Sequence, residues 1–157
     1  MKIKLLVIGK TDKDFIKTGI LEYEKRLKHY LPYEMQIIPD IKRSGNFSEK
    51  QQKEKEGELI LTKINSGDVV VLLDEGGKEY SSVKFARFIE QKMLSGMKNL
   101  IFVIGGAYGF SEAVYQKVQG KVSLSQMTFS HEMVRMIFVE QLYRSMTILK
   151  GEPYHHV

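Results

Sequence analysis

Two short, uninterrupted apolar segments constrain the fold of this chain most. The first, in Asp68–Leu73, is the run Val-Val-Val-Leu-Leu that follows the aspartate, and the second, Leu100–Ile104, reads Leu-Ile-Phe-Val-Ile. A strand without alternating polar residues is buried on both of its faces, which is typical of the centre of a parallel sheet covered by helices. The two segments therefore favour an α/β protein built around a mainly parallel sheet.

The remainder of the chain supports this prediction because strand and helix patterns alternate along it. Further strands are expected at Ile3–Ile8, Met35–Ile38 and Val122–Leu124. Helices are expected over 11–31 (begun by Thr11, ended by Pro32), 48–64 (begun by a capping box at Ser48), 81–94, a short segment from Ser111, and 131–150 (closed by Gly151). Five strands interleaved with helices indicate one domain around a mainly parallel sheet.

The last predicted helix, His131–Lys150, is unusually apolar. Its first nineteen residues carry only the charged side chains of Glu132, Arg135, Glu140 and Arg144. A helix without a polar face is expected to be buried on all sides, here against its own sheet and a second subunit. Hydroxyl and imidazole side chains flank it, in Leu124–His131 before and Pro153–His156 after, which suggests a site where two chains meet.

Composition excludes several classes of protein. The chain has 157 residues, a formal net charge of +5 and no cysteine, so it can form no disulfide, thiolate nucleophile or cysteine-rich zinc site. The four histidines show no ligand spacing with carboxylates, and no metal site is expected. No apolar run approaches the length needed to span a membrane and no signal peptide is apparent, so a soluble cytoplasmic protein is expected.

Three predicted strands end in segments suited to binding a ligand. Glycines follow Leu73 (Asp74-Glu75-Gly76-Gly77) and Ile104 (Gly105-Gly106-Ala107-Tyr108-Gly109), and the fifth strand leads into Leu124–Phe129. In open α/β sheets, ligands bind at the carboxyl ends of the strands, so we expect a nucleotide-type pocket there. Neither the G-x-G-x-x-G dinucleotide fingerprint nor a Gly-Lys-Ser/Thr phosphate loop is present, which disfavours NAD-dependent oxidation and P-loop phosphoryl transfer.

These motifs together carry a resemblance to a known family. The chain resembles the RlmH-type methyltransferases of the SPOUT superfamily, which methylate N3 of a pseudouridine in 23S ribosomal RNA. The similarity covers the whole chain, and its motifs are Leu73-Asp74-x-x-Gly, Phe102–Gly109, Leu124–His131, Val139–Arg144 and Pro153–His155. Each motif is weak alone, whereas the combined set near the C-terminus is specific.

The resemblance implies a fold, a cofactor and partners. It implies one SPOUT domain over residues 1–157 whose cofactor-binding part, about residues 69–157, forms a C-terminal trefoil knot, a rare exception to unthreaded topology. It also implies S-adenosyl-L-methionine as cofactor, a homodimer, and 23S ribosomal RNA in the assembled ribosome as substrate. Carried over residue by residue, cofactor contacts are expected at Leu73, Gly105, Leu124, Ser125, Gln126, Met127, Thr128 and Phe129.

For the catalytic residues we hypothesise four side chains. N3 of pseudouridine carries a proton at neutral pH, so a base or a cation that stabilises the deprotonated ring should assist. His131 or His155 would take part in proton transfer, Arg135 would stabilise negative charge on the base or its phosphate, and Tyr154 would stack on the nucleotide. His131 and Arg135, one helical turn apart, are expected on one helix face. Candidates for phosphate contacts are Lys10, Lys25, Arg26, Lys42 and Arg43.

Three alternatives remain open from the sequence. The chain could methylate another RNA, it could be a nucleotide-binding enzyme outside methyl transfer, or it could be a non-catalytic module that binds ribosomes. The Glu140–Arg144 pair is expected to be a structural ion pair at helical spacing, and Arg135 an ion pair at a subunit interface if it does not bind a phosphate or carboxylate.

Overall fold

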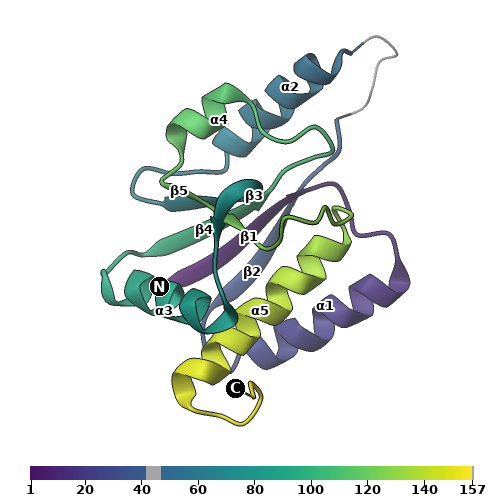
Figure 1. The fold of residues 1–157 in the computed structure, drawn as a ribbon. Coiled ribbons are helices and arrows are strands. Elements are labelled where there is room, and N and C mark those ends of the chain that lie inside the picture. The colour runs from purple at the N-terminus through teal and green to yellow at the C-terminus, as the bar shows by residue number, and fades with distance from the viewer. Residues whose placement is uncertain (42–46, 157) are drawn as a thin grey trace.

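The fold is a five-stranded parallel sheet between two layers of helices (Figure 1). The computed structural model describes residues 1–41 and 47–156. Each neighbouring pair of strands is parallel, and the spatial order is β2-β1-β4-β3-β5. The strands are β1 (Lys2–Ile8), β2 (Tyr33–Ile38), β3 (Val69–Glu79), β4 (Asn99–Ile104) and β5 (Gly120–Ser123). The predicted α/β class with a mainly parallel sheet is confirmed.

The helices divide between the two faces of the sheet. Helices α1 (Asp14–Leu27), α3 (Ser82–Leu94) and α5 (Met133–Lys150) cover one face, with α5 between the other two. Helices α2 (Glu49–Leu61) and α4 (Glu112–Lys117) cover the opposite face. Both faces of β4 are therefore buried, as its uninterrupted apolar sequence predicts: Phe102 packs toward Phe138 of α5, and Val103 lies in the core under α2 and α4.

Most of the predicted helix ends are correct because short side chains cap them locally. Ser48 forms the expected capping box with Gln51, and the hydroxyls of Ser81 and Ser111 accept from backbone N–H groups of α3 and α4. Gly151 ends α5 in the left-handed conformation with φ of 67°. None of the helices in the described part of the chain is long and apolar enough to cross a membrane. The trefoil knot stays a prediction.

The third strand does not end where the sequence suggests. We expected Leu73 to be its last residue, but β3 continues to Glu79. Leu73 and Lys78 both align with Val122 of β5, so the intervening residues 74–77 form a bulge and the strand then resumes its pairing. The glycine-rich segment after Leu73 is thus a detour within one strand rather than a turn into a helix.

The last helix also differs from its prediction. It begins at Met133 rather than at His131, which lies in the preceding turn, so His131 and Arg135 do not share a helix face. Phe138 and Leu142 are fully buried against the sheet. Other side chains of α5 are only half-buried, for example Tyr143, whose ring lies against Tyr23 of α1. Burial on all sides therefore does not occur within one chain.

The beginning of α1 is capped from a distant part of the sequence. Thr11 does not cap it: no side chain of its own segment accepts from its first N–H groups, and the Thr11 hydroxyl accepts a hydrogen bond from Arg135 instead. The Glu132 carboxylate accepts from the backbone N–H groups of Asp12 and Lys13, the latter at 3.3 Å. An anion at this end of the helix is also stabilised by the positive end of the helix dipole. These N–H groups hold the pKa of Glu132 below its usual value.

We expect Glu132→Gln to lower the free energy of unfolding by about 1–2 kcal/mol at neutral pH, since it removes a charge-assisted cap. A carboxyl whose pKa falls on folding stabilises the native state above its unfolded pKa, near 4.3, and loses this contribution as pH falls through the folded pKa. Urea titrations should therefore show the largest difference between the two proteins above about pH 5 and a progressively smaller one as the pH falls through the folded-state pKa of Glu132. Glu90→Gln, at an exposed position of α3, is the control; an equal loss there would contradict the assignment.

Candidate active site

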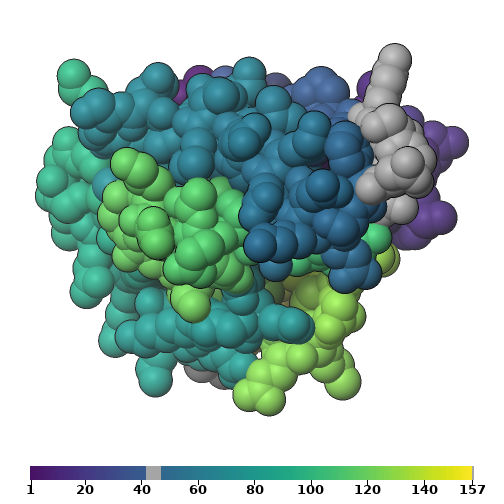
Figure 2. Space-filling view, turned by 90° about the horizontal axis from the view of Figure 1, so that it is seen from above, coloured from purple at the N-terminus to yellow at the C-terminus, as the bar shows by residue number. Residues whose placement is uncertain are grey.

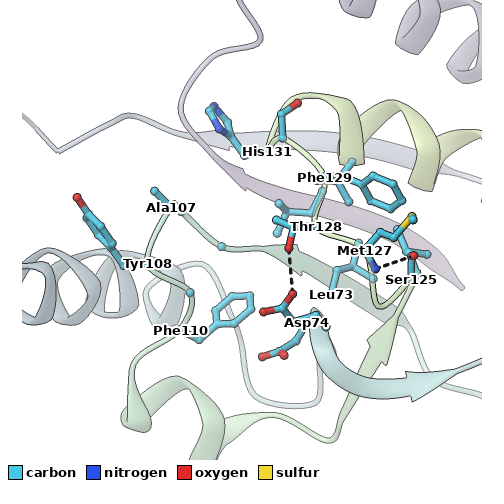
Figure 3. A pocket seen from close by; sticks show the side chains of 18 of the residues that line it. Leu73, Asp74, Ala107, Tyr108, Phe110, Ser125, Met127, Thr128, Phe129 and His131 are labelled. Carbon is cyan, nitrogen blue, oxygen red and sulfur yellow. Dashed lines mark hydrogen bonds between the residues drawn. The ribbon is translucent and has the colours of Figure 1, made fainter.

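A cavity of about 740 Å³ lies at the carboxyl ends of the central strands (Figure 3). Its walls come from the end of the first part of β3, the loop between β4 and α4, and the segment between β5 and α5. Such a volume suits a nucleotide-sized ligand. The cavity occupies the place where parallel α/β sheets bind their ligands, and the three segments are the ones that the sequence singled out.

The loop after β4 depends on glycine at two of its positions. Gly109 has a φ of 78°, and its N–H donates to the carbonyl oxygen of Gly106 at 3.2 Å, which closes a tight turn. A Cβ atom on Gly105 would lie 3.1 Å from the ring of Phe110, which is itself 6% exposed. A larger residue at 105 would therefore push this ring, and with it the cavity wall, out of place.

Asp74 forms a fixed anionic point in the bulge of β3. Its carboxylate accepts from the hydroxyl of Tyr115 and from the N–H of Gly76, the latter at 2.7 Å. Burial, together with the hydrogen bond to Asp74, raises the pKa of Tyr115 to about 12. Tyr115 packs edge-on to Phe110, with ring centroids 5.9 Å apart. Helix α4 thus holds both the bulge of β3 and the loop after β4.

The segment between β5 and α5 forms the third wall. The Ser125 hydroxyl accepts from the N–H of Met127 at 2.9 Å, drawn as a dashed line in Figure 3, which folds the segment back on itself. Thr128 donates from its hydroxyl to the carboxylate of Glu75 at 3.3 Å and so joins this wall to the bulge of β3. The side chain of Met127 is 77% exposed.

The structure brings most of the predicted cofactor residues together. Among the described residues, those of the predicted set that line the cavity are Leu73, Gly105, Leu124, Ser125, Met127, Thr128 and Phe129. Gln126 belongs to the same segment but does not line the cavity. Of the four predicted catalytic residues, only His131 lines it.

Tyr154 and His155 lie far from this cavity within the same chain. They follow the C-terminal end of α5, whereas the cavity lies at its N-terminal end (Figure 1). Eighteen helical residues separate the two ends, which is about 27 Å. One chain therefore does not unite these side chains with its own cavity.

The tail instead forms a compact polar cluster with α5. Arg144 donates to Glu140, with a shortest separation of 2.6 Å, which confirms the expected ion pair. The hydroxyl of Tyr154 donates to Glu140 at 2.9 Å, and its ring lies 4.6 Å from the Arg144 guanidinium carbon. Burial, with hydrogen bonds to Tyr23 and Glu140, raises the pKa of Tyr154 above its usual value.

The arrangement of His155 determines which of its ring nitrogens is free. Arg144 lies 3.2 Å from Nδ1 of His155. Because a guanidinium only donates hydrogen bonds, Nδ1 must accept, and the neutral imidazole then carries its proton on Nε2. In this arrangement His155 offers an N–H donor rather than a proton acceptor.

Arg135 does not face the cavity. Its side chain has no exposed surface, and its guanidinium donates to the carbonyl oxygens of Ile8 and Gly9, at 2.6 and 2.9 Å, and to the hydroxyl of Thr11 at 3.0 Å. Burial lowers its pKa, a shift opposed first by Glu132. This side chain anchors the end of β1 to α5, so the hypothesis that it contacts the substrate is not supported by its position.

The basic residues that were predicted to contact RNA phosphates lie in different parts of the chain. Lys10 is exposed just after β1, while Lys25 and Arg26 lie on α1, where Arg26 pairs with Glu22 at 2.7 Å. Lys42 and Arg43 lie outside the described residues. No group of three or more His, Cys, Asp or Glu side chains in the described ranges, 1–41 and 47–156, is placed to hold a metal ion.

Sequence reasoning missed several side chains of the cavity. Asp74 belongs to the motif Leu73-Asp74-x-x-Gly, so the sequence could have indicated it. Tyr115 and Lys53 lie in helices whose sequences do not indicate that they reach the cavity. Lys53 is contributed by α2, about twenty residues before the nearest motif. Only the packing of α2 and α4 against the loop after β4 reveals both residues.

Comparison with known proteins identifies the family. Residues 1–155 match the family described as "Predicted SPOUT methyltransferase". The chain belongs to the SPOUT methyltransferase family. Three relatives, each named "Ribosomal RNA large subunit methyltransferase H", align over 156 residues and 99% of both chains; they come from Parabacteroides distasonis (60% identical), Flavobacterium johnsoniae (61%) and Porphyromonas gingivalis (52%). This SPOUT methyltransferase is thus an enzyme similar over its full length to curated methyltransferases, and the predicted family is confirmed.

Proposed function

We propose that this SPOUT methyltransferase transfers the methyl group of S-adenosyl-L-methionine to N3 of pseudouridine 1915 in 23S ribosomal RNA. The observation that carries the proposal is the full-length similarity, at 52–61% identity, to enzymes named for the large ribosomal RNA. The cavity at the predicted cofactor segments supports it. Assembled ribosomes are the proposed substrate, which would place the enzyme in the cytoplasm.

The residues of the cavity fit this cofactor. Gly105 brings backbone into the wall, and Leu73 and Leu124 supply apolar surface on which an adenine could lie. Asp74 accepts hydrogen bonds from two neutral donors and places a carboxylate beside the cavity, which suits a cationic ligand. When bound, the sulfonium of the cofactor would supply an electrophilic methyl group and a neutral leaving group.

The chain's own contribution is to orient the pseudouridine and to remove its N3 proton. His131, the single imidazole that lines the cavity among the described residues, is the proposed proton acceptor. His155 would donate from Nε2–H to a carbonyl oxygen of the base and stabilise the negative charge that develops there, while Tyr154 would stack on the ring. This division refines the hypothesis that either histidine acts as the base.

A homodimer would unite the two sets of residues. The cavity and the tail lie at opposite ends of α5, so a partner chain running antiparallel would bring its tail to this chain's cavity. The half-buried side chains of α5 and the exposed side chain of Phe15 on α1, 61% accessible, offer apolar surface for such an interface.

Mixed dimers test the shared site. We expect His155→Ala and Gly105→Val homodimers to be almost inactive, the first with cofactor binding retained and the second without it. Equal mixing after unfolding and refolding should restore about a quarter of the wild-type activity, because half of the dimers are hybrids and each hybrid has one intact site. No recovery, despite hybrid formation seen by native mass spectrometry, would place each site within one chain.

The decisive experiment is methyl transfer from labelled S-adenosyl-L-methionine to ribosomes that lack the modification, with nucleoside mass spectrometry of the product. N3-methylpseudouridine in the large-subunit RNA is expected. Methylation of another RNA would redirect the substrate but keep the chemistry. Cofactor-independent association with ribosomes, without any transfer, would favour a non-catalytic module, and stabilisation by NAD or ATP alone would favour a different nucleotide enzyme.

A further inference from the structure

One charged side chain of the cavity has neither a hydrogen bond nor an ion pair among the described residues. The two acids there are engaged: Asp74 accepts from Tyr115 and Gly76, and Glu75 accepts from Thr128. Lys53 of α2 also lines the cavity and is half-buried, yet no acid among the described residues lies within 4.0 Å of its ammonium. A partly desolvated cation of this kind favours an anionic ligand.

The neighbouring lysines of α2 have local partners. Lys50 lies 4.0 Å from Glu54, one turn further along the helix. Lys55 is placed over the ring of Phe47, with its ammonium 4.3 Å from the ring centroid. Lys53 is thus distinguished from them by facing the cavity rather than another side chain.

Helix α2 is held firmly against the cavity wall. A Cβ atom on Gly57 would overlap the hydroxyl of Ser111, and one on Gly106 would lie within 2.8 Å of the carboxyl carbon of Glu56. Figure 2 shows the atoms of α2 (blue) directly against those of α4 (green). Because Gly57 and Glu56 leave no space between α2 and the neighbouring loop, Lys53 is presented to the cavity from a fixed backbone.

We propose that Lys53 binds a backbone phosphate of the RNA beside the nucleotide that is methylated. The inference rests on the proposed function and adds a substrate contact to it. An enzyme that modifies a base takes the base into its pocket and leaves the flanking phosphates at the rim. The lysine ammonium binds a phosphate as a point charge, so it does not require one fixed orientation of the phosphate oxygens.

The position of Lys53 favours phosphate over the carboxylate of the cofactor. The residues proposed to hold the cofactor come from β3, the loop after β4 and the segment before α5. Lys53 comes from none of these but from the outer helix layer, on the opposite face of the sheet from α5. Phosphate contacts position an RNA without reading its sequence, so Lys53 is expected to act on affinity.

The test compares Lys53→Gln with Lys50→Gln, a matched charge removal one turn earlier on the same helix. Binding to unmodified ribosomes is measured against salt concentration, with calorimetric binding of S-adenosyl-L-methionine and steady-state turnover alongside. For Lys53→Gln we expect affinity for ribosomes to fall about fivefold to tenfold near 0.1 M salt, and the slope of log K against log salt to weaken by about 0.7–0.9. Cofactor affinity and kcat should stay near wild type.

Two controls make the outcome decisive. Lys53→Arg keeps the charge and should retain most of the affinity, and thermal unfolding should show that all variants are folded. A loss of cofactor affinity with unchanged ribosome binding would assign Lys53 to the cofactor carboxylate, and equal behaviour of the 53 and 50 variants would make it an ordinary surface cation; either result overturns the inference. A wild-type protein that binds ribosomes but transfers no methyl group would contradict the proposed function, while the salt slope would still test Lys53.

Discussion

Arg135→Met is expected to lower the free energy of unfolding by about 3 kcal/mol, since it leaves buried carbonyl oxygens without their donor. Methionine approximates the volume of the arginine stem, so little of the effect should come from a cavity. The guanidinium joins the carbonyls of Ile8 and Gly9, at the end of β1, to a helix more than 120 residues later. The loss is a large part of the stability of an ordinary domain, and urea unfolding measures it directly.

Arg87→Met on α3 provides the matched control, because Arg87 is exposed. We expect this variant to unfold within about 0.5 kcal/mol of the wild type. Steady-state kinetics of the same variant test the hypothesis of a substrate contact: if Arg135 only anchors β1, the folded Arg135→Met enzyme should keep its KM for ribosomes below its unfolding temperature. A raised KM with unchanged stability would support the hypothesis that Arg135 contacts the RNA substrate.

Gly77→Ala is expected to abolish measurable cofactor binding and to destabilise the protein by about 2 kcal/mol or more. A Cβ atom at this position would lie 2.7 Å from three backbone atoms of Lys121 and Val122. Backbone of a paired strand cannot rotate away as a side chain does, so the second part of β3 must separate from β5. This separation would displace Asp74 and Glu75, which line the cavity from the same bulge. Calorimetry with S-adenosyl-L-methionine and thermal unfolding measure the two effects.

Gly120→Ala tests whether the effect is specific to the close approach. Gly120 lies on β5 itself, and a Cβ atom there would meet nothing within 4 Å. We expect this variant to bind the cofactor with wild-type affinity and to lose little stability. Equal losses in both variants would mean that alanine is poorly tolerated anywhere along this strand pair, and that the bulge has no special role.

The elements of this fold were predictable wherever local chemistry determines them. Ser48, Ser81 and Gly151 lie at helix ends for reasons contained in a few neighbouring residues, and the apolar segment 100–104 could only be a buried strand. The errors arose where distant residues decide. The continuation of β3 depends on pairing with β5, and the start of α1 is satisfied by Glu132 rather than by Thr11.

In the candidate site, too, the features set by neighbouring residues were predictable and those set by distant residues were not. Residues of the glycine-rich and Leu124–Phe129 segments were predicted because they follow strands whose ends must meet at one edge of the sheet. Arg135 was expected to share a helix face with His131, but helical spacing shows neither where the helix begins nor what a face packs against. Lys53 and Tyr115 could not be found, because nothing in a helix records which loop it will cover.

The strand order has a consequence for the time course of synthesis. Strand β1 lies between β2 and β4, and its residues pair with β4 partners 97 positions later, as Lys2 does with Asn99. The first two strands alone would form only a two-stranded parallel ribbon, which is not stable by itself. Nascent chains shorter than about 100 residues should thus stay unfolded on the ribosome, and the cavity should close only when α5 emerges with Arg135 to secure the end of β1.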